Sequence, residues 1–80
     1  GPLPPQNWGV STQKEDQVYL HILDKKENIY IEEFPYKVSA IRLLNDNGEV
    51  TYEQIGNSLD ISLTNTNSSA VDYIIALTCN

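Results

Sequence analysis

The chain has 80 residues, a hydrophobic fraction of 40% and a formal net charge of −6 at pH 7. Its length supports a single domain with a thin core, because a chain of this size buries only about 60–65% of the surface that its unfolded form exposes. The negative charge disfavours nucleic acid and anionic membranes as partners, since both present negative surfaces. No apolar run approaches the roughly 20 residues of a membrane-spanning helix.

The N-terminal segment is predicted to be an extended arm rather than a helix. Residues 1–9 hold three of the four prolines and two of the four glycines. Proline fixes φ and removes a backbone donor, which disfavours both a helix interior and a central strand. Residues 10–16 are polar and are interpreted as the continuation of this arm. The sequence therefore predicts an interdomain arm over 1–16 and a folded domain over 17–80.

Short strand-like runs separated by turn residues follow the arm. The first, Gln17 to Leu23, places Val18, Leu20 and Ile22 on one face and Tyr19, His21 and Leu23 on the other. Further runs are predicted at residues 28–33, 38–44, 50–55, 59–63 and 71–78. About six runs at roughly 8–12-residue spacing favour an antiparallel sandwich or barrel. The predicted fold class is all-β, a small Greek-key-like antiparallel β-sandwich of about six to eight strands.

His21 is the only histidine in the chain and the first candidate for chemistry. A histidine that acts as a general base needs an orienting partner and a reacting group within about 3 Å. No nucleophile motif lies near it in the sequence. We therefore expect a half-buried strand residue with a hydrogen-bonded ring nitrogen, and ligand contact is the alternative.

The remaining reactive groups do not form a recognisable catalytic or metal-binding set. Glu32 and Glu33 are adjacent, and neighbouring strand residues point to opposite faces, so they are not expected to flank one glycosidic bond. The stretch NDNGE lacks the alternating acidic series of a calcium loop. Cys79 is the single cysteine and is interpreted as an incidental thiol near a frayed terminus. We expect no metal and no cofactor.

Trp8 is the most informative aromatic residue because it lies in the proline-rich arm. The tyrosines are dispersed over the predicted strands, where aromatic side chains are common. Trp8 is expected to pack the arm onto this domain or onto a neighbouring domain, and contact with a sugar is the alternative.

The stretch GPLPPQNWGVSTQKEDQVYLHILD resembles the junction and first strand of the C-terminal domain of α-L-fucosidases, glycoside hydrolase family 29. The matching arm positions are Gly1, Pro2, Pro4, Pro5, Trp8, Gly9, Thr12, Gln13 and Lys14, and the matching strand positions are Val18, Tyr19, His21, Ile22 and Leu23. Ser11 stands where Thr is common. The later stretch FPYKVSAIRLLNDNGEVTYEQIGNSLDISL resembles the later strands of the same domain, with Ser58 where Gly is common.

The resemblance implies a C-terminal antiparallel β-sandwich coupled to an N-terminal (β/α)₈-like catalytic domain. That catalytic domain removes terminal α-L-fucose with retention of configuration. It has no counterpart in these 80 residues, so the resemblance transfers no catalytic residue to this chain. It places Trp8, Tyr19 and His21 at the expected interface with the catalytic domain, and it implies an extracytoplasmic setting, periplasmic or secreted.

Two functions from different classes follow from these observations. The first is a non-catalytic accessory domain that packs on the catalytic barrel, with an exposed apolar patch near Trp8 in the isolated domain. The alternative is a carbohydrate-binding module for fucosylated glycans, which requires an aromatic platform on one face. A free-standing enzyme would need two convergent carboxylates and is disfavoured.

Overall fold

A computed structural model describes residues 2–24, 27–67 and 72–80 of the chain. The described residues form seven strands and no helix. The strands are β1 (Gly9–Lys14), β2 (Gln17–Ile22), β3 (Asn28–Ile31), β4 (Val38–Leu43), β5 (Glu49–Ile55), β6 (Ser58–Thr64) and β7 (Tyr73–Cys79). The arm was predicted to begin at Gly1 and the last strand at Val71, and both residues lie outside the described part of the chain.

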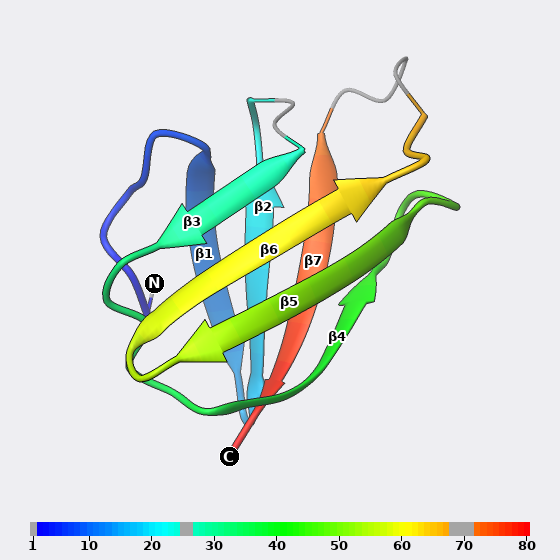
Figure 1. Cartoon of the computed structure of the whole chain (residues 1–80). Coiled ribbons are helices and arrows are strands. Elements are labelled where there is room, and N and C mark those ends of the chain that lie inside the picture. Colours follow the sequence, from blue (N-terminus) through cyan, green and yellow to red (C-terminus); the bar gives the residue numbers. More distant parts are fainter. Residues whose placement is uncertain (1, 25–26, 68–71) are drawn as a thin grey trace.

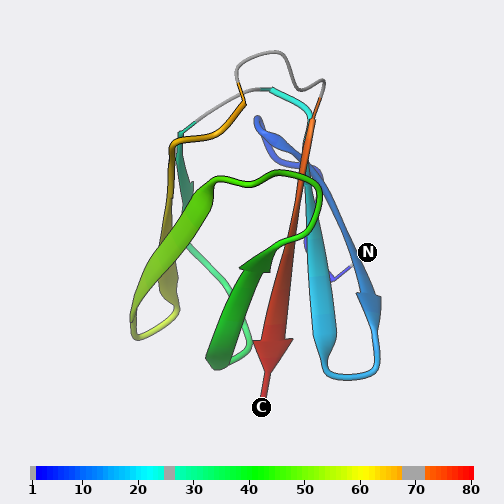
Figure 2. The same cartoon turned by 90° about the vertical axis from the view of Figure 1, so that its right-hand side faces the viewer.

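The strands form two antiparallel sheets that pack face to face (Figures 1 and 2). The four-stranded sheet has the order β1-β2-β7-β4, and the three-stranded sheet has the order β3-β6-β5. Several neighbours, such as β2 and β7 or β3 and β6, are not consecutive in the chain, as a Greek-key-like arrangement requires. The all-β sandwich that the strand spacing predicts is thus confirmed.

Alternation of apolar and polar residues explains how the two sheets share one core. Val18, Leu20 and Ile22 of β2 are fully buried, and the residues between them are half-buried on the opposite face. In β6 the strictly alternating stretch 59–63 behaves as predicted, with its apolar residues buried against the other sheet. Because side chains alternate along a strand, these patterns fix which face of each sheet is inside.

The second half of the predicted arm is a strand of the sandwich, which corrects the expected boundary at residue 16. Strand β1 pairs with β2 along its whole length, from Gly9 opposite Ile22 to Lys14 opposite Gln17. Its outward residues are exposed and polar after Val10, so the segment carries little apolar signal of its own. The buried Ser11 hydroxyl accepts a hydrogen bond from the Leu3 backbone N–H at 3.1 Å. The interdomain role of residues 1–16 stays a prediction.

Gly9 makes this entry into β1 possible. Its φ is +152°, and a Cβ at this position would lie 1.9 Å from the His21 carbonyl oxygen. The chain turns here from the N-terminal segment into the sheet, with the Leu23 N–H donating to the Trp8 carbonyl at 2.8 Å. Only glycine permits this close backbone approach.

Two further expectations about chain segments change in the structure. Strand β3 ends at Ile31, so Glu32 and Glu33 lie in the exposed connection beyond it rather than on alternate faces of a strand. Cys79 is buried within β7, and its N–H donates to the Asp16 carbonyl at 2.8 Å. The end of the chain is therefore a paired strand, and the frayed terminus expected around Cys79 was wrong.

The described part of the chain contains no helix that is long and apolar enough to cross a membrane.

Candidate functional site

The outer face of the four-stranded sheet carries a continuous row of apolar residues around His21. The strand register places Val10 opposite His21, and His21 opposite Ile74. Leu44, just beyond β4, continues the row, since its N–H donates to the Ile74 carbonyl at 2.9 Å. Val10 is 42% exposed and Leu44 is 45% exposed, whereas His21 and Ile74 are half-buried. We refer to Val10, His21, Ile74 and Leu44 as the apolar row.

A second row beside it is also poor in charge. Here Thr12 lies opposite Tyr19, Tyr19 opposite Ala76, and Ala76 opposite Arg42. Ala76 is buried although it belongs to the outer face, because longer side chains flank it on both neighbouring strands. The part of the outer face that β7 contributes is therefore largely non-polar, since Ile74 and Ala76 both belong to it.

Tyr19 and His21, two of the predicted interface residues, lie on this face. Both side chains are half-buried. The His21 Nε2 lies 3.1 Å from the Thr12 Oγ1, within hydrogen-bond distance. The expectation of a half-buried strand histidine with a hydrogen-bonded ring nitrogen is confirmed. Their contact with a second domain stays a prediction.

Trp8, the third predicted residue, belongs to the core instead of the surface. Its side chain is only 2% exposed, and its Nε1 has no hydrogen-bond partner. A ring so deeply buried cannot stack on a sugar or contact another domain unless the N-terminal segment moves. The expectation that Trp8 packs the arm onto this domain is therefore confirmed, whereas a place at an exposed domain interface or on a sugar does not fit a buried ring.

The surface beside Trp8 nevertheless presents apolar side chains. A shallow concavity of about 280 Å³ is lined by Trp8, Pro5, Val10 and Leu23, among others. Leu23 is 59% exposed, and it adds to the apolar row at the end nearest Val10. The expected exposed apolar patch near Trp8 is therefore present, with Val10 and Leu23 as its exposed members.

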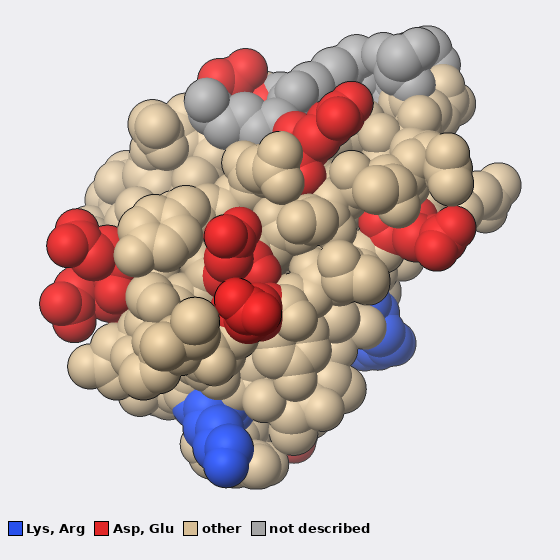
Figure 3. Space-filling model, in the orientation of Figure 1, with Lys and Arg blue, Asp and Glu red and all other residues tan. Residues whose placement is uncertain are grey.

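The two outer faces differ sharply in charge. The strands of the four-stranded sheet contain Lys14 and Arg42 and no Asp or Glu. The strands of the three-stranded sheet contain Glu49, Glu53 and Asp60 and no Lys or Arg. In Figure 3, which shows the molecule from the side of the three-stranded sheet, acidic groups are distributed over this face and basic groups are visible only near its margins.

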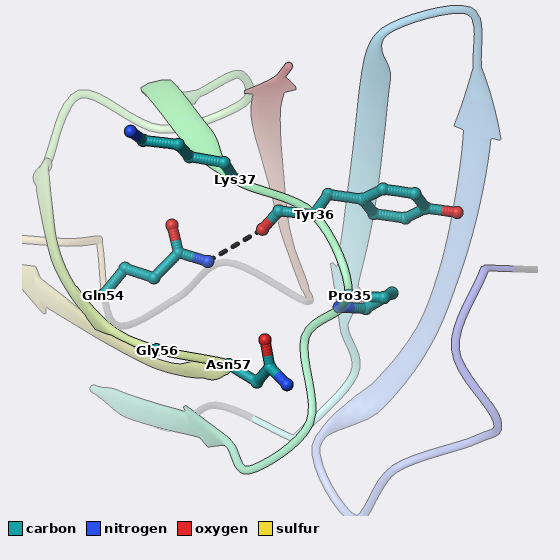
Figure 4. A pocket seen from close by; sticks show the side chains of 6 residues that line it. All are labelled: Pro35, Tyr36, Lys37, Gln54, Gly56 and Asn57. Carbon is teal, nitrogen blue, oxygen red and sulfur yellow. Dashed lines mark hydrogen bonds between the residues drawn. The ribbon is translucent and has the colours of Figure 1, made fainter.

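A polar pocket at one end of the sandwich is the other candidate for ligand binding. It has a volume of about 380 Å³ and is lined by Pro35, Tyr36, Lys37, Gln54, Gly56 and Asn57 (Figure 4). The Gln54 amide is occupied on both sides, since it donates to the Tyr36 carbonyl at 2.8 Å and accepts from the Val38 N–H at 2.9 Å.

This pocket does not provide the aromatic platform that a sugar site needs. Tyr36 is its one aromatic lining residue, and Figure 4 shows the Tyr36 ring pointing away from Gln54. The ring packs edge-on against Phe34, with centroids 5.7 Å apart. The tyrosine is therefore used within the fold, and the pocket favours no particular ligand.

The described residues also lack a metal-binding cluster, because no group of three or more His, Cys, Asp and Glu side chains converges within them. Glu32 and Glu33 are both exposed and line a separate shallow concavity with Leu3 and Ile31.

Comparison with protein families, curated proteins and solved structures found no match to this chain. The resemblance to α-L-fucosidases therefore stays a prediction that rests on the sequence.

Sequence reasoning missed Val10, Ile74 and Leu44 as candidate surface residues. One signal was available for Ile74, because the last strand-like run is apolar at both alternating positions rather than at one. Such a strand is typical of a sheet that is covered on both faces. Val10 was hidden in the polar arm, and Leu44 lies beyond its strand.

Proposed function

We propose that this chain is a non-catalytic accessory domain of an α-L-fucosidase of glycoside hydrolase family 29. In this proposal the catalytic (β/α)₈-like domain belongs to the same parent chain and lies outside these 80 residues. It hydrolyses terminal α-L-fucosides with retention, and the present domain packs on it and stabilises it. The setting is extracytoplasmic, periplasmic or secreted, and the domain itself uses no cofactor and has no nucleic-acid or membrane partner.

The observation that carries the accessory role is the apolar row on the outer face of the four-stranded sheet. An antiparallel sheet with one solvated face normally alternates apolar and polar residues, so that its outer side chains are hydrophilic. Here Val10, His21, Ile74 and Leu44 form a row across the sheet. Contiguous exposed apolar patches on soluble proteins are typical of protein contacts. The sequence resemblance supplies the family of the partner.

The arrangement of the acidic residues supports a non-catalytic domain. A retaining glycosidase needs two carboxyl groups about 5 Å apart that face one bond. Glu53 and Asp60 lie opposite each other, but both are exposed on the outer face of the three-stranded sheet. Glu32 and Glu33 lie side by side in an exposed connection. The carboxyl groups of both pairs are therefore exposed to solvent.

The test begins with the coding sequence that surrounds this chain. If a (β/α)₈-like domain precedes residue 1, the parent protein should hydrolyse a chromogenic aryl α-L-fucoside. Removal of the 80 residues should lower its thermal stability while the reaction keeps its retaining stereochemistry. A parent that hydrolyses other glycosides but no fucoside would contradict the family assignment.

The carbohydrate-binding alternative is tested on the chain itself. Amide NMR spectra are recorded during titration with L-fucose and fucosylated oligosaccharides. We expect no localised shifts in the millimolar range. Saturating shifts that cluster in one surface region would replace the accessory role by glycan recognition.

A further inference from the structure

We propose that the outer face of the four-stranded sheet is the docking face of this domain, and that it binds an apolar protein surface rimmed by carboxylates on the neighbouring domain of the parent chain. This inference rests on the proposed accessory function. It adds the face, the orientation and the chemistry of the partner surface, none of which the sequence resemblance specifies.

The apolar side chains on this face extend across the sheet from one edge to the other. Val10 and Leu44 stand at opposite edges of the sheet, and Leu23 extends the patch beyond β2. His21 and Ile74 fill the middle of the row. Interfaces between domains combine such an apolar centre with a polar rim.

The charged residues of the strands specify the rim of the partner. Lys14 and Arg42 are the only charged residues in the four strands that form this face. The connections that flank these strands hold Glu15, Asp16 and Asp72, so within the strands only Lys14 and Arg42 offer a cation to a carboxylate of the partner. An acidic rim on the partner would therefore orient the docking as well as favour it.

The opposite face of the sandwich does not fit the same partner. Across the three-stranded sheet, Tyr30 lies opposite Asp60, and Asp60 lies opposite Glu53. Two carboxylates that lie directly opposite each other on neighbouring strands repel each other, and surrounding water weakens this repulsion. Burying it against a protein would require desolvation of both charges.

A second copy of this chain is a poorer occupant than a neighbouring domain. In a two-fold dimer through this face, each copy would bring Lys14 and Arg42 and no carboxylate from its strands to pair with them. Contact between the basic face of one copy and the acidic face of another would be heterologous and would not close. The segment 2–8 leads through Gly9 into Val10, so a preceding domain would be tethered at the edge of the row.

The inference is tested by hydroxyl-radical footprinting of the 80-residue chain and of the full parent protein. We expect the oxidation of Val10, Leu23 and Leu44 to slow several-fold in the parent. Oxidation of Ile55 and Tyr30, which are 69% and 58% exposed on the three-stranded sheet, should not change. Slowed oxidation of Ile55 and Tyr30 instead would overturn the choice of face.

Matched variants give an independent measurement in the parent protein. Leu44→Asp should release the domain, so that thermal unfolding shows a separate transition for it, whereas Ile55→Asp on the other sheet should leave unfolding unchanged. Arg42→Glu should weaken docking in the same direction as Leu44→Asp. Equal behaviour of Leu44→Asp and Ile55→Asp would refute the proposal.

Failure of the docking face and failure of the proposed function give different results. Protection of Val10 and Leu44 in a parent that does not hydrolyse fucosides supports the face and rejects the family. Fucosidase activity without this protection rejects the face and leaves the family standing. Protection that develops in the isolated chain as its concentration rises would identify a second copy as the occupant and overturn the proposal.

Discussion

The Gln54 side chain joins the two layers of the sandwich, and its replacement is the most direct test of how the fold is held together. Gln54 belongs to β5 in the three-stranded sheet. Its amide donates to the Tyr36 carbonyl and accepts from the Val38 N–H, at 2.8 and 2.9 Å. Val38 begins β4 in the other sheet, so these two bonds fix the chain where it crosses between the layers.

The expected loss for Gln54→Leu follows from these two bonds. Leucine has a similar volume but leaves a partly buried N–H and a partly buried carbonyl without their partners. Each lost hydrogen bond costs about 1 kcal/mol net, so the free energy of unfolding should fall by about 2 kcal/mol. In a domain of this size such a loss lowers the melting temperature by about 8–16 °C.

Gln54→Glu adds a pH dependence whose sign the geometry determines. A protonated carboxyl can still donate to the Tyr36 carbonyl and accept from the Val38 N–H, whereas a carboxylate can no longer donate. Folding therefore favours the protonated form and raises the pKa of the introduced group above its ordinary value of about 4.3. Its contribution to stability is present below that value and is lost as the pH rises through the raised pKa.

The assay is urea unfolding followed by tryptophan fluorescence at about pH 4 and about pH 7, values that bracket the ordinary pKa of glutamate. Relative to the unsubstituted chain, Gln54→Glu should be more destabilised at the higher pH, and Gln54→Leu equally destabilised at both. Gln13→Leu is the control, because Gln13 is exposed and its side-chain contacts are both 3.4 Å long. If Gln54→Leu is no less stable than this control, the two hydrogen bonds of the Gln54 amide do not contribute to holding the sheets together.

Three further predictions concern single residues. Gly9→Ala should abolish or severely weaken folding, because the added Cβ would lie 1.9 Å from the His21 carbonyl oxygen. Gly56→Ala is the control, because no atom lies within 4 Å of its added Cβ at φ +58°, and it should cost only about 1–2 kcal/mol in thermal unfolding. Trp8→Ala should cost about 3–5 kcal/mol in urea unfolding followed by circular dichroism, because Trp8 is the only tryptophan. Trp8→Phe should cost less, since phenylalanine fills most of the space and removes a buried unpaired donor. Burial, and to a smaller extent the charge of Asp16, raises the pKa of the Cys79 thiol. The free energy of unfolding should therefore fall as the pH rises from the ordinary cysteine pKa through the raised one. Thiol reagents should react slowly with Cys79 until urea is added.

Much of the fold could be predicted because its strands follow the two-residue period closely. In β6, Leu59, Ile61 and Leu63 alternate with polar residues, and this pattern alone gives the type of element and its buried face. The sequence does not state which strands are neighbours. Pairing of β7 with both β2 and β4 depends on contacts between distant segments, which a local pattern does not encode.

The N-terminal region shows why a local interpretation fails at a sheet edge. Strand β1 has only one paired neighbour, and most of its outward residues can be polar at no cost. Proline and glycine in front of it suggested an arm throughout. Trp8 was recognised as a packing residue, but the depth of its burial depends on Gly9, whose close approach to His21 places the preceding segment over the end of the core.

The docking face illustrates a property that is present in the sequence but becomes visible only with the topology. The charge of −6 describes the whole chain and suggests an evenly solvated surface. Once the strands are assigned to sheets, every Asp and Glu that lies within a strand belongs to the three-stranded sheet. The four-stranded sheet has instead the apolar row, with Lys14 and Arg42 on the same sheet. An entirely solvated domain has no physical need for this segregation, whereas a domain that buries one sheet against a partner keeps carboxylates off the buried face because their desolvation is costly.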